Sequence, residues 1–231
     1  MTAGDRVRWL LRGLGQLLIT LGVVVLLFCV YELQVTGLYT QDQQRALGHE
    51  LDRTWAAAPA PSPGKPVPPL AAFDPGKGIA RIYLPSLGRD QVHVVVEGVS
   101  HADLKKGPGH YPGTARPGDV GNVVISGHRT TYGAPFNRLD ELHPGDPVVL
   151  ETQGFFYTYR VRRSTVVKPS AIEVTYPVPG DRGATPRERL LTLTTCNPKY
   201  SAKTRLIVLA VLESRLAKAP GVVPPALAGR R

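Results

Sequence analysis

Cysteine is scarce in this chain of 231 residues, which contains only Cys29 and Cys196. Cys29 lies in an apolar stretch near the N-terminus, so a structural disulfide between the two is not expected. Cys29 is interpreted as a small hydrophobic side chain. Cys196, in "LTLTTCNPKYSAKTR", therefore needs another explanation.

Dense basic segments and internal repeats are also missing, although the formal net charge is +10. No Lys/Arg block interleaved with aromatic residues and no nucleic-acid motif is visible, so a nucleic-acid partner is not expected. The charge is spread thinly and fits a membrane or envelope surface as well as a basic soluble domain. The length is enough for one good-sized domain with appendages.

The N-terminal region predicts a membrane anchor. Residues 13–31 carry no charged side chain, and as a helix they would span about 28 Å, close to the hydrocarbon thickness of a bilayer. Arg6, Arg8 and Arg12 precede them, which places the N-terminus in the cytoplasm. A cleaved signal peptide is the alternative, disfavoured because no small-x-small cleavage site follows promptly. We expect a single-pass protein of the cell membrane whose main domain is extracellular.

The sequence divides into five segments. Residues 1–12 form a basic cytoplasmic N-terminus, and residues 13–33 form the anchor. Residues 34–78 form a stalk, in which Leu47, Leu51 and Trp55 predict a short amphipathic helix and seven prolines after residue 55 predict an extended spacer. Residues 79–216 form the folded domain, and residues 217–231 are expected to be a disordered tail.

The folded domain is predicted to be β-rich. Short runs of Val, Ile, Leu, Thr and Tyr are separated by Gly, Pro and Asp, which points to a barrel or a sandwich. Gln153 and Gly154 mark a hairpin, and only "SHADLKKG" and "FNRLDEL" indicate helical turns. The expected strands are "IARIYLP", "QVHVVVEG", "GNVVISG", "DPVVLET", "FFYTYRVRRSTVV", "RLLTLTTC" and "TRLIVLAVLES".

Cys196 closes a Thr-rich strand, and Arg205 opens the next apolar run. An inert buried thiol is the ordinary interpretation of a lone cysteine. Outside the membrane, however, an unpaired thiol is exposed to oxidation, and strand ends are where reactive groups are presented. If the two strands are antiparallel neighbours, Cys196 and Arg205 meet at one barrel end, where the guanidinium can bind an oxyanion.

A cysteine nucleophile also needs a group that moves protons, and histidine is the usual one. His128 follows a strand and a glycine, so its ring would be displayed at a strand end. His110, in a Gly/Pro turn, is a secondary candidate. The remaining histidines are interpreted as surface or structural residues: His49, His93, His101 and His143.

These residues carry a family resemblance. "NVVISGHRTTYGAPFNRLDEL" together with "TLTTCNPKYSAKTRLIV" resembles the sortase family of cell-surface transpeptidases over residues 79–213. "GHYPGT" and "TTCNPKYSAKTR" most resemble the class E members of high-GC Gram-positive bacteria. The resemblance implies an eight-stranded β-barrel with short helices, preceded by one transmembrane helix and a proline-rich linker.

The resemblance also implies the chemistry. Cys196 attacks the Thr carbonyl of a Leu-Ala-X-Thr-Gly or Leu-Pro-X-Thr-Gly sorting signal, Arg205 stabilises the oxyanion or aligns the substrate, and His128 protonates the departing Gly amine. An amine from the cell-wall cross-bridge or its lipid-linked precursor resolves the thioacyl enzyme. No cofactor or metal is expected. Four residues are expected to bind substrate: Tyr111, Tyr132, Thr195 and Asn197.

Two alternatives remain open. One is another extracytoplasmic cysteine enzyme, a peptidase or an L,D-transpeptidase. The latter pattern places His and Cys in one short motif, whereas 68 positions separate His128 from Cys196 here. The other is a non-enzymatic anchored β-domain, which leaves Cys196 unexplained.

Overall fold

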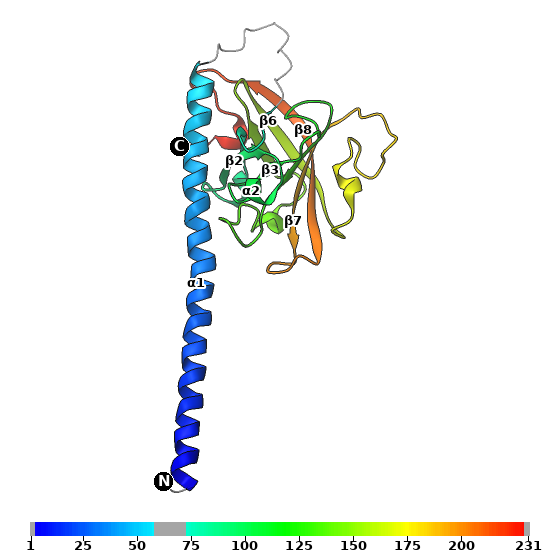
Figure 1. The fold of residues 1–231 in the computed structure, drawn as a ribbon. Coiled ribbons are helices and arrows are strands. Elements are labelled where there is room, and N and C mark those ends of the chain that lie inside the picture. Colours follow the sequence, from blue (N-terminus) through cyan, green and yellow to red (C-terminus); the bar gives the residue numbers. More distant parts are fainter. Residues whose placement is uncertain (1–2, 58–72, 229–231) are drawn as a thin grey trace.

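The structure is a computed structural model, and it describes residues 3–57 and 73–228. A long N-terminal helix, α1 (Ala3–Ala57), stands beside a β-rich domain (Figure 1). Most of the proline-rich spacer expected within residues 34–78 lies outside the described residues.

Eight strands of the described chain close into a barrel in the order β1-β2-β3-β4-β7-β8-β6-β5. All neighbouring pairs are antiparallel except β2 with β3 and β4 with β7, which are parallel. The strands are β1 (Gly78–Tyr83), β2 (Val92–Glu97), β3 (Gly109–His110), β4 (Gly121–Ser126), β5 (Pro147–Glu151), β6 (Phe155–Val167), β7 (Arg189–Asn197) and β8 (Thr204–Ala217).

The barrel confirms the sortase-like architecture expected from the sequence, and each of the seven predicted strands is present. The predicted hairpin is present too, because the Thr152 N–H donates to the Phe155 carbonyl across the turn. The eighth strand, β3, has only two residues and lies in the "GPGHYPG" segment that was interpreted as a turn. A two-residue strand has too few residues to show an alternating pattern.

The short helices are α2 (His101–Leu104) and four 3-10 turns. The Ser100 side chain caps α2 by accepting from the Asp103 N–H, which explains why "SHADLKKG" forms a helical turn. The 3-10 turns are η1 (Pro85–Leu87), η2 (Leu139–Glu141), η3 (Ile172–Thr175) and η4 (Pro225–Leu227).

The barrel interior is filled by alternate residues of its strands. Val123 and Ile125 of β4 and Leu191 and Leu193 of β7 are at most 1% exposed and belong to one core cluster. Because side chains alternate along a strand, this packing fixes the register of β4 against β7. Ser126 pairs with Thr194 at the end of that register, which is the end that leads into the candidate site.

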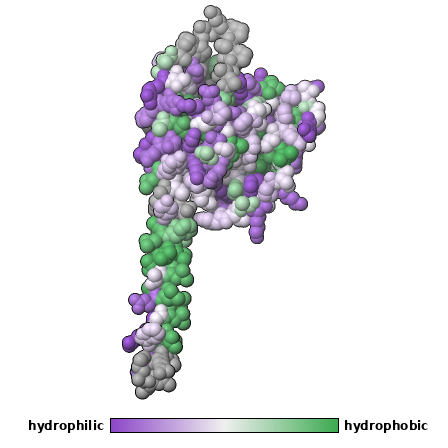
Figure 2. Space-filling view, in the orientation of Figure 1, coloured by the Kyte–Doolittle hydropathy of each residue, from purple (hydrophilic) through white to green (hydrophobic). Residues whose placement is uncertain are grey.

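Helix α1 is longer than the sequence indicated. One continuous helix of 55 residues replaces the separate anchor and short amphipathic helix. Its N-terminal part is long and apolar enough to cross a membrane and is not buried in the protein. Figure 2 shows this part as a green, hydrophobic stretch that extends away from the largely hydrophilic domain.

The C-terminal part of α1 packs directly on the barrel. Leu47 and Leu51 form a core cluster with Val94 and Val96 of β2. The Gln44 amide bonds main-chain groups of the same strand, because its Nε2 donates to the Val94 carbonyl (3.0 Å) and its Oε1 accepts from the Val94 N–H (2.7 Å). The C-terminal part of α1 therefore holds the barrel in a fixed position. The distance along the helix between the barrel and the apolar part of α1 is set by these contacts.

The C-terminal segment also differs from the expected disordered tail. The described chain continues to residue 228, and η4 places Leu227 against Val149 and Phe156. Leu227 is 6% exposed, so its burial in an apolar cluster explains why this segment packs on the barrel.

Candidate active site

Cys196 and Arg205 are directly opposite each other in the β7–β8 pair. Opposed residues of antiparallel strands have their Cβ atoms about 4.5–5.5 Å apart on the same face. The Arg205 Nη1 donates to the carbonyls of Ala202 and Thr204, both at 3.0 Å, which holds this side chain along the end of the hairpin. The predicted pairing of Cys196 with Arg205 at one barrel end is confirmed by this register.

His128 reaches the same barrel end through the parallel β4–β7 pair. The Gly127 N–H donates to the Thr194 carbonyl (3.1 Å), and the Thr195 hydroxyl donates to the Gly127 carbonyl (2.8 Å), so the pairing continues beyond β4. Each residue of β4 pairs with the β7 residue 68 positions later in the sequence, as Ser126 does with Thr194. Continuing this register by two residues places His128 beside Cys196. The 68-residue separation in the sequence is thus one step across the barrel wall.

Gly127 is needed because the chain passes very close to the Phe136 ring. A Cβ at this position would lie 2.6 Å from a Phe136 ring carbon, and Phe136 is fully buried. The Phe136 N–H also donates to the His128 carbonyl (3.1 Å). The main chain on both sides of His128 is therefore fixed by the core, which orients the imidazole.

The His128 ring is half-buried against Tyr132, with ring centroids 5.0 Å apart. Burial, and secondarily the nearby His101, lower the pKa of His128, so the neutral imidazole is favoured. Its Nε2 is buried and has no hydrogen-bond partner among the described residues. This unpaired nitrogen is the feature of the ring that packing within the described chain does not explain.

Tyr132 links His128 to helix α1 through Lys105. The Lys105 ammonium lies 5.5 Å from the centroid of the Tyr132 ring, and the Lys105 carbonyl accepts from the Thr40 hydroxyl of α1 (2.7 Å). Tyr132 also has a positive φ of 51°, which its loop imposes. Of the four expected substrate-binding residues, Tyr132 is the one that contacts the His128 ring.

Thr195 and Asn197 have polar groups that bond neighbouring parts of the chain. Thr195 is 2% exposed, and its hydroxyl bonds Gly127 as described above. The Asn197 Oδ1 accepts from Arg129 (2.6 Å), and its Nδ2 donates to the Thr204 hydroxyl (3.1 Å). These bonds hold both side chains in place at the end of β7, and the direct substrate contact expected for them stays a prediction.

Tyr111 lies further from this barrel end. Its N–H donates to the Val124 carbonyl, four residues before His128 along the chain. Four residues of extended chain span about 13 Å. The main chain of Tyr111 is therefore set back from the strand ends where Cys196 and His128 lie, and its contact with substrate stays a prediction. His110 is buried, with its Nδ1 2.7 Å from a Glu97 carboxylate oxygen, which gives it a structural role.

Arg129 is a site residue that the sequence analysis missed. It is 4% exposed, and its Nη1 donates to the Cys196 carbonyl (3.2 Å) as well as to Asn197. Its Nη2 pairs with Asp140 (2.9 Å). The planar guanidinium thus ties the main chain of Cys196 to the loop after His128. The available signal was its place beside His128 in "GHR".

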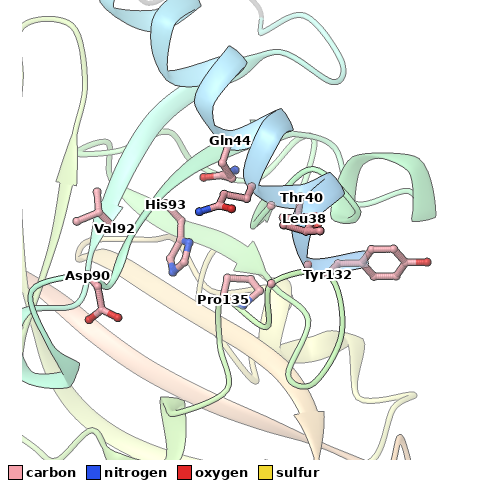
Figure 3. Close-up of a pocket in the computed structure, with 12 residues that line it drawn as sticks. Leu38, Thr40, Gln44, Asp90, Val92, His93, Tyr132 and Pro135 are labelled. Atoms are coloured by element: carbon pink, nitrogen blue, oxygen red, sulfur yellow. The ribbon is translucent and has the colours of Figure 1, made fainter. Parts of the chain in front are cut away.

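A cavity of about 460 Å³ lies beside Tyr132, between α1 and the barrel. Figure 3 shows Leu38, Thr40 and Gln44 of α1 on one side and His93 and Pro135 on the other. The His93 Nε2 is buried and has no hydrogen-bond partner in the described chain. Burial lowers the pKa of His93 to about 4, with a small opposing effect of Asp90.

The arrangement brings a thiol, an imidazole and a guanidinium to three adjacent strand ends, and these are the groups that acyl transfer through cysteine uses. Within the described residues, no cluster of three or more His, Cys, Asp or Glu side chains has the geometry to hold a metal ion.

Comparison with known proteins agrees with this geometry. The family model for the sortase domain matches residues 82–213, more than half of the chain. The chain belongs to the sortase family. It is 38% identical to Sortase SrtE1 of Streptomyces coelicolor over 205 residues, which cover 85% of this chain and 55% of that protein. It is 30% identical to Sortase SrtE2 of the same organism, covering 84% and 79%. The chain therefore spans little more than half the length of SrtE1.

Solved sortase structures have the same fold. The structure of sortase E from Streptomyces avermitilis has a TM-score of 0.61 and 42% identity, covering 67% of this chain and 99% of that chain. The SrtF sortase from Corynebacterium diphtheriae has a TM-score of 0.66 and 30% identity, covering 72% and 98%. These similarities support the class E resemblance. Cys196, His128, Arg129 and Arg205 all lie within the matched sortase domain.

Proposed function

We propose that this protein is a membrane-anchored cysteine transpeptidase that joins secreted proteins to a cell-wall amine. The observation that carries the proposal is the strand register: Cys196 pairs with Arg205, and the β4–β7 offset brings His128 to the same level. The substrate is a C-terminal sorting signal of the form Leu-Ala-X-Thr-Gly or Leu-Pro-X-Thr-Gly, cleaved between Thr and Gly.

The acylation step uses all three residues. The neutral His128 imidazole, favoured by burial, accepts the thiol proton of Cys196. The thiolate attacks the Thr carbonyl, and the Arg205 guanidinium stabilises the oxyanion or aligns the substrate main chain. The tetrahedral intermediate expels the Gly amine, which takes the proton from His128. A thioacyl bond between Cys196 and the Thr carbonyl remains.

The second step transfers the acyl group. An amine from the peptidoglycan cross-bridge or from its lipid-linked precursor attacks the thioester, and its proton passes to His128. The Cys196 thiolate leaves and is reprotonated. The new bond is an amide between the Thr carbonyl and the incoming amine, so the protein substrate ends covalently attached to the wall.

Helix α1 serves as an uncleaved anchor in this proposal. Its apolar part crosses the cell membrane once, the N-terminal arginines lie in the cytoplasm, and the barrel is extracellular. The helix fits this role by its length and composition. The positive charge before the apolar part and its absence within residues 13–31 support the orientation.

Incubation of the full chain in detergent with Leu-Ala-X-Thr-Gly and Leu-Pro-X-Thr-Gly peptides and triglycine tests the activity. We expect mass spectrometry to show cleavage after Thr and a Thr–triglycine product.

The Ala signal should be preferred by about ten- to a hundredfold in kcat/KM, because Ala has a main-chain N–H for a Tyr132 hydroxyl and Pro has none. Arg205→Lys should lose activity as severely as Arg205→Ala, because a point charge does not replace the planar fork. Cleavage of neither peptide would contradict the proposal.

A further inference from the structure

The loop between β7 and β8, residues 198–203, presents an aromatic side chain to solvent. Tyr200 is 86% exposed, whereas the neighbouring strands bury most of their apolar side chains. Its main chain has a positive φ of 65°, a conformation that is rare for a bulky residue. Since the exposed ring gains little from packing within the domain, that packing does not explain why this strained position holds tyrosine.

The loop is a built turn. The Ser201 N–H donates to the Pro198 carbonyl (3.0 Å), and the Lys203 N–H donates to the Ser201 hydroxyl (3.3 Å). Arg205 holds the Ala202 carbonyl from the base of the turn. These bonds hold the main chain on both sides of Tyr200, so the ring is carried by a structured turn.

Two lysines flank the ring. Lys203 is exposed, and Lys199 is partly exposed, with its ammonium 3.9 Å from one Asp140 carboxylate oxygen. That carboxylate is already bound closely by Arg129, so it neutralises Lys199 only weakly. The tip of the loop therefore carries an aromatic ring between two cations, which is the composition that favours the interface of an anionic bilayer.

The orientation of the loop fits this partner. Figure 1 shows the β7–β8 hairpin pointing toward the N-terminal end of α1 and reaching beyond α2 in that direction. Thr40 bonds the Lys105 carbonyl just after α2, so the helix and this side of the barrel are fixed to each other. Thr40 follows the end of the apolar segment at Tyr31 by nine residues, which is about 14 Å of helix.

We propose that Tyr200, with Lys199 and Lys203, binds anionic phospholipid headgroups at the bilayer surface. Cys196 and Arg205 lie at the base of the same loop, so this contact holds the edge of the active site at the membrane surface. Protein substrates that are tethered to the membrane can then reach Cys196. The inference rests on the proposed function in one respect, since it requires that α1 spans the membrane.

The experiment uses the full chain in proteoliposomes of phosphatidylcholine with or without phosphatidylglycerol. In a Cys29→Ala, Cys196→Ala background, Tyr200→Cys is labelled with bimane and quenched by spin-labelled lipid. The matched control is Ser214→Cys, an exposed position at the opposite end of β8. We expect at least twofold stronger quenching at 200 than at 214. Lys199→Gln and Lys203→Gln should each weaken the lipid contact about fivefold with phosphatidylglycerol present.

Activity gives the second readout. With Cys196 intact, Tyr200→Ser should lower transpeptidation severalfold in phosphatidylglycerol vesicles and leave the peptide KM in neutral detergent unchanged. Equal quenching at 200 and 214 in vesicles that retain the protein after carbonate washing overturns the inference and leaves the anchor intact. Release of the protein by carbonate overturns both. A raised peptide KM in detergent shows that Tyr200 contacts the sorting peptide, which also overturns the lipid assignment.

Discussion

At the scale of single residues, Arg129 connects the main chain of Cys196 to the loop that follows His128. Three acceptors share its guanidinium: the Cys196 carbonyl, the Asn197 side chain and the Asp140 carboxylate. It does not face a substrate in the proposed mechanism, so it acts through the position of the Cys196 main chain. This role is invisible in the sequence, because it depends on the register that brings "GHR" beside "TTC".

Arg129→Lys is expected to lower the free energy of unfolding by about 2–4 kcal/mol, because the half-buried Asn197 side chain and the Cys196 carbonyl oxygen lose their shared donor. It should also lower kcat at least tenfold while changing KM for the peptide little. Urea unfolding and steady-state kinetics measure the two effects. Arg163→Lys, on the exposed face of β6, is the matched control and should change neither. A loss of stability with kcat unchanged would contradict the positioning role.

His93 makes the fold sensitive to acid. Its pKa is about 4 in the folded state against an ordinary value of 6.5, so between those values the unfolded chain binds more protons. Stability contributed by neutral His93 is therefore present above pH 6.5 and lost as the pH falls toward 4, by at most about 3 kcal/mol.

The comparison of His93→Gln with wild type, by urea unfolding at pH 7 and pH 4.5, measures this contribution. The variant should lose less stability on acidification. His143→Gln is the control, because the side chain of His143 is 82% exposed. An identical loss in wild type and His93→Gln would show that His93 is not the acid-sensitive group.

At the scale of elements, the contact between α1 and β2 determines where the barrel sits. The Gln44 amide bonds both main-chain groups of Val94 and also the Lys106 carbonyl (2.7 Å). Leu47 and Leu51 add an apolar contact one and two turns further along the helix. The same face of α1 therefore combines a polar clamp with a hydrophobic patch.

Gln44→Ala should lower the free energy of unfolding by about 1–3 kcal/mol, because the buried Val94 groups lose their partners. Tryptophan fluorescence during urea unfolding of the full chain in detergent reports the change. Gln41→Ala, an exposed position one turn earlier, is the control and should be nearly neutral. If both variants behave alike, the amide contact does not hold the helix to the barrel.

The sequence predicted the long strands, but it did not predict the short strand β3 or the polar contacts between α1 and the barrel. Runs of apolar and β-branched residues identified β4, β7 and β8, each of which buries at least five consecutive residues, whereas β3 has two residues and no pattern. The polar contacts of Thr40 and Gln44 were missed because their partners are main-chain groups more than 45 residues away. Cys196, Arg205 and His128 were singled out because each stands at a predicted strand end and their motifs resemble those of the sortase family; their catalytic roles stay predictions.

At the scale of the whole molecule, α1 has two parts. Its N-terminal part is a candidate membrane anchor, and its C-terminal part packs on the barrel. If the apolar segment remains in the mature protein, its N-terminal arginines remain too. Intact mass and N-terminal sequencing of protein purified from native membranes should give a chain that includes residues 1–31. A mature N-terminus after residue 31 would show a cleaved signal peptide.

The central claim is that Cys196 forms the acyl enzyme with the help of His128. Intact mass spectrometry of the full chain, mixed with a Leu-Ala-X-Thr-Gly peptide and quenched in acid, tests it directly. We expect a mass increase equal to the Leu-Ala-X-Thr acyl group, mapped to Cys196, in wild type and in the control Cys29→Ala. Cys196→Ala and His128→Ala should show no adduct while their far-UV circular dichroism stays unchanged. Acylation at wild-type rate in either of these two variants would contradict the account.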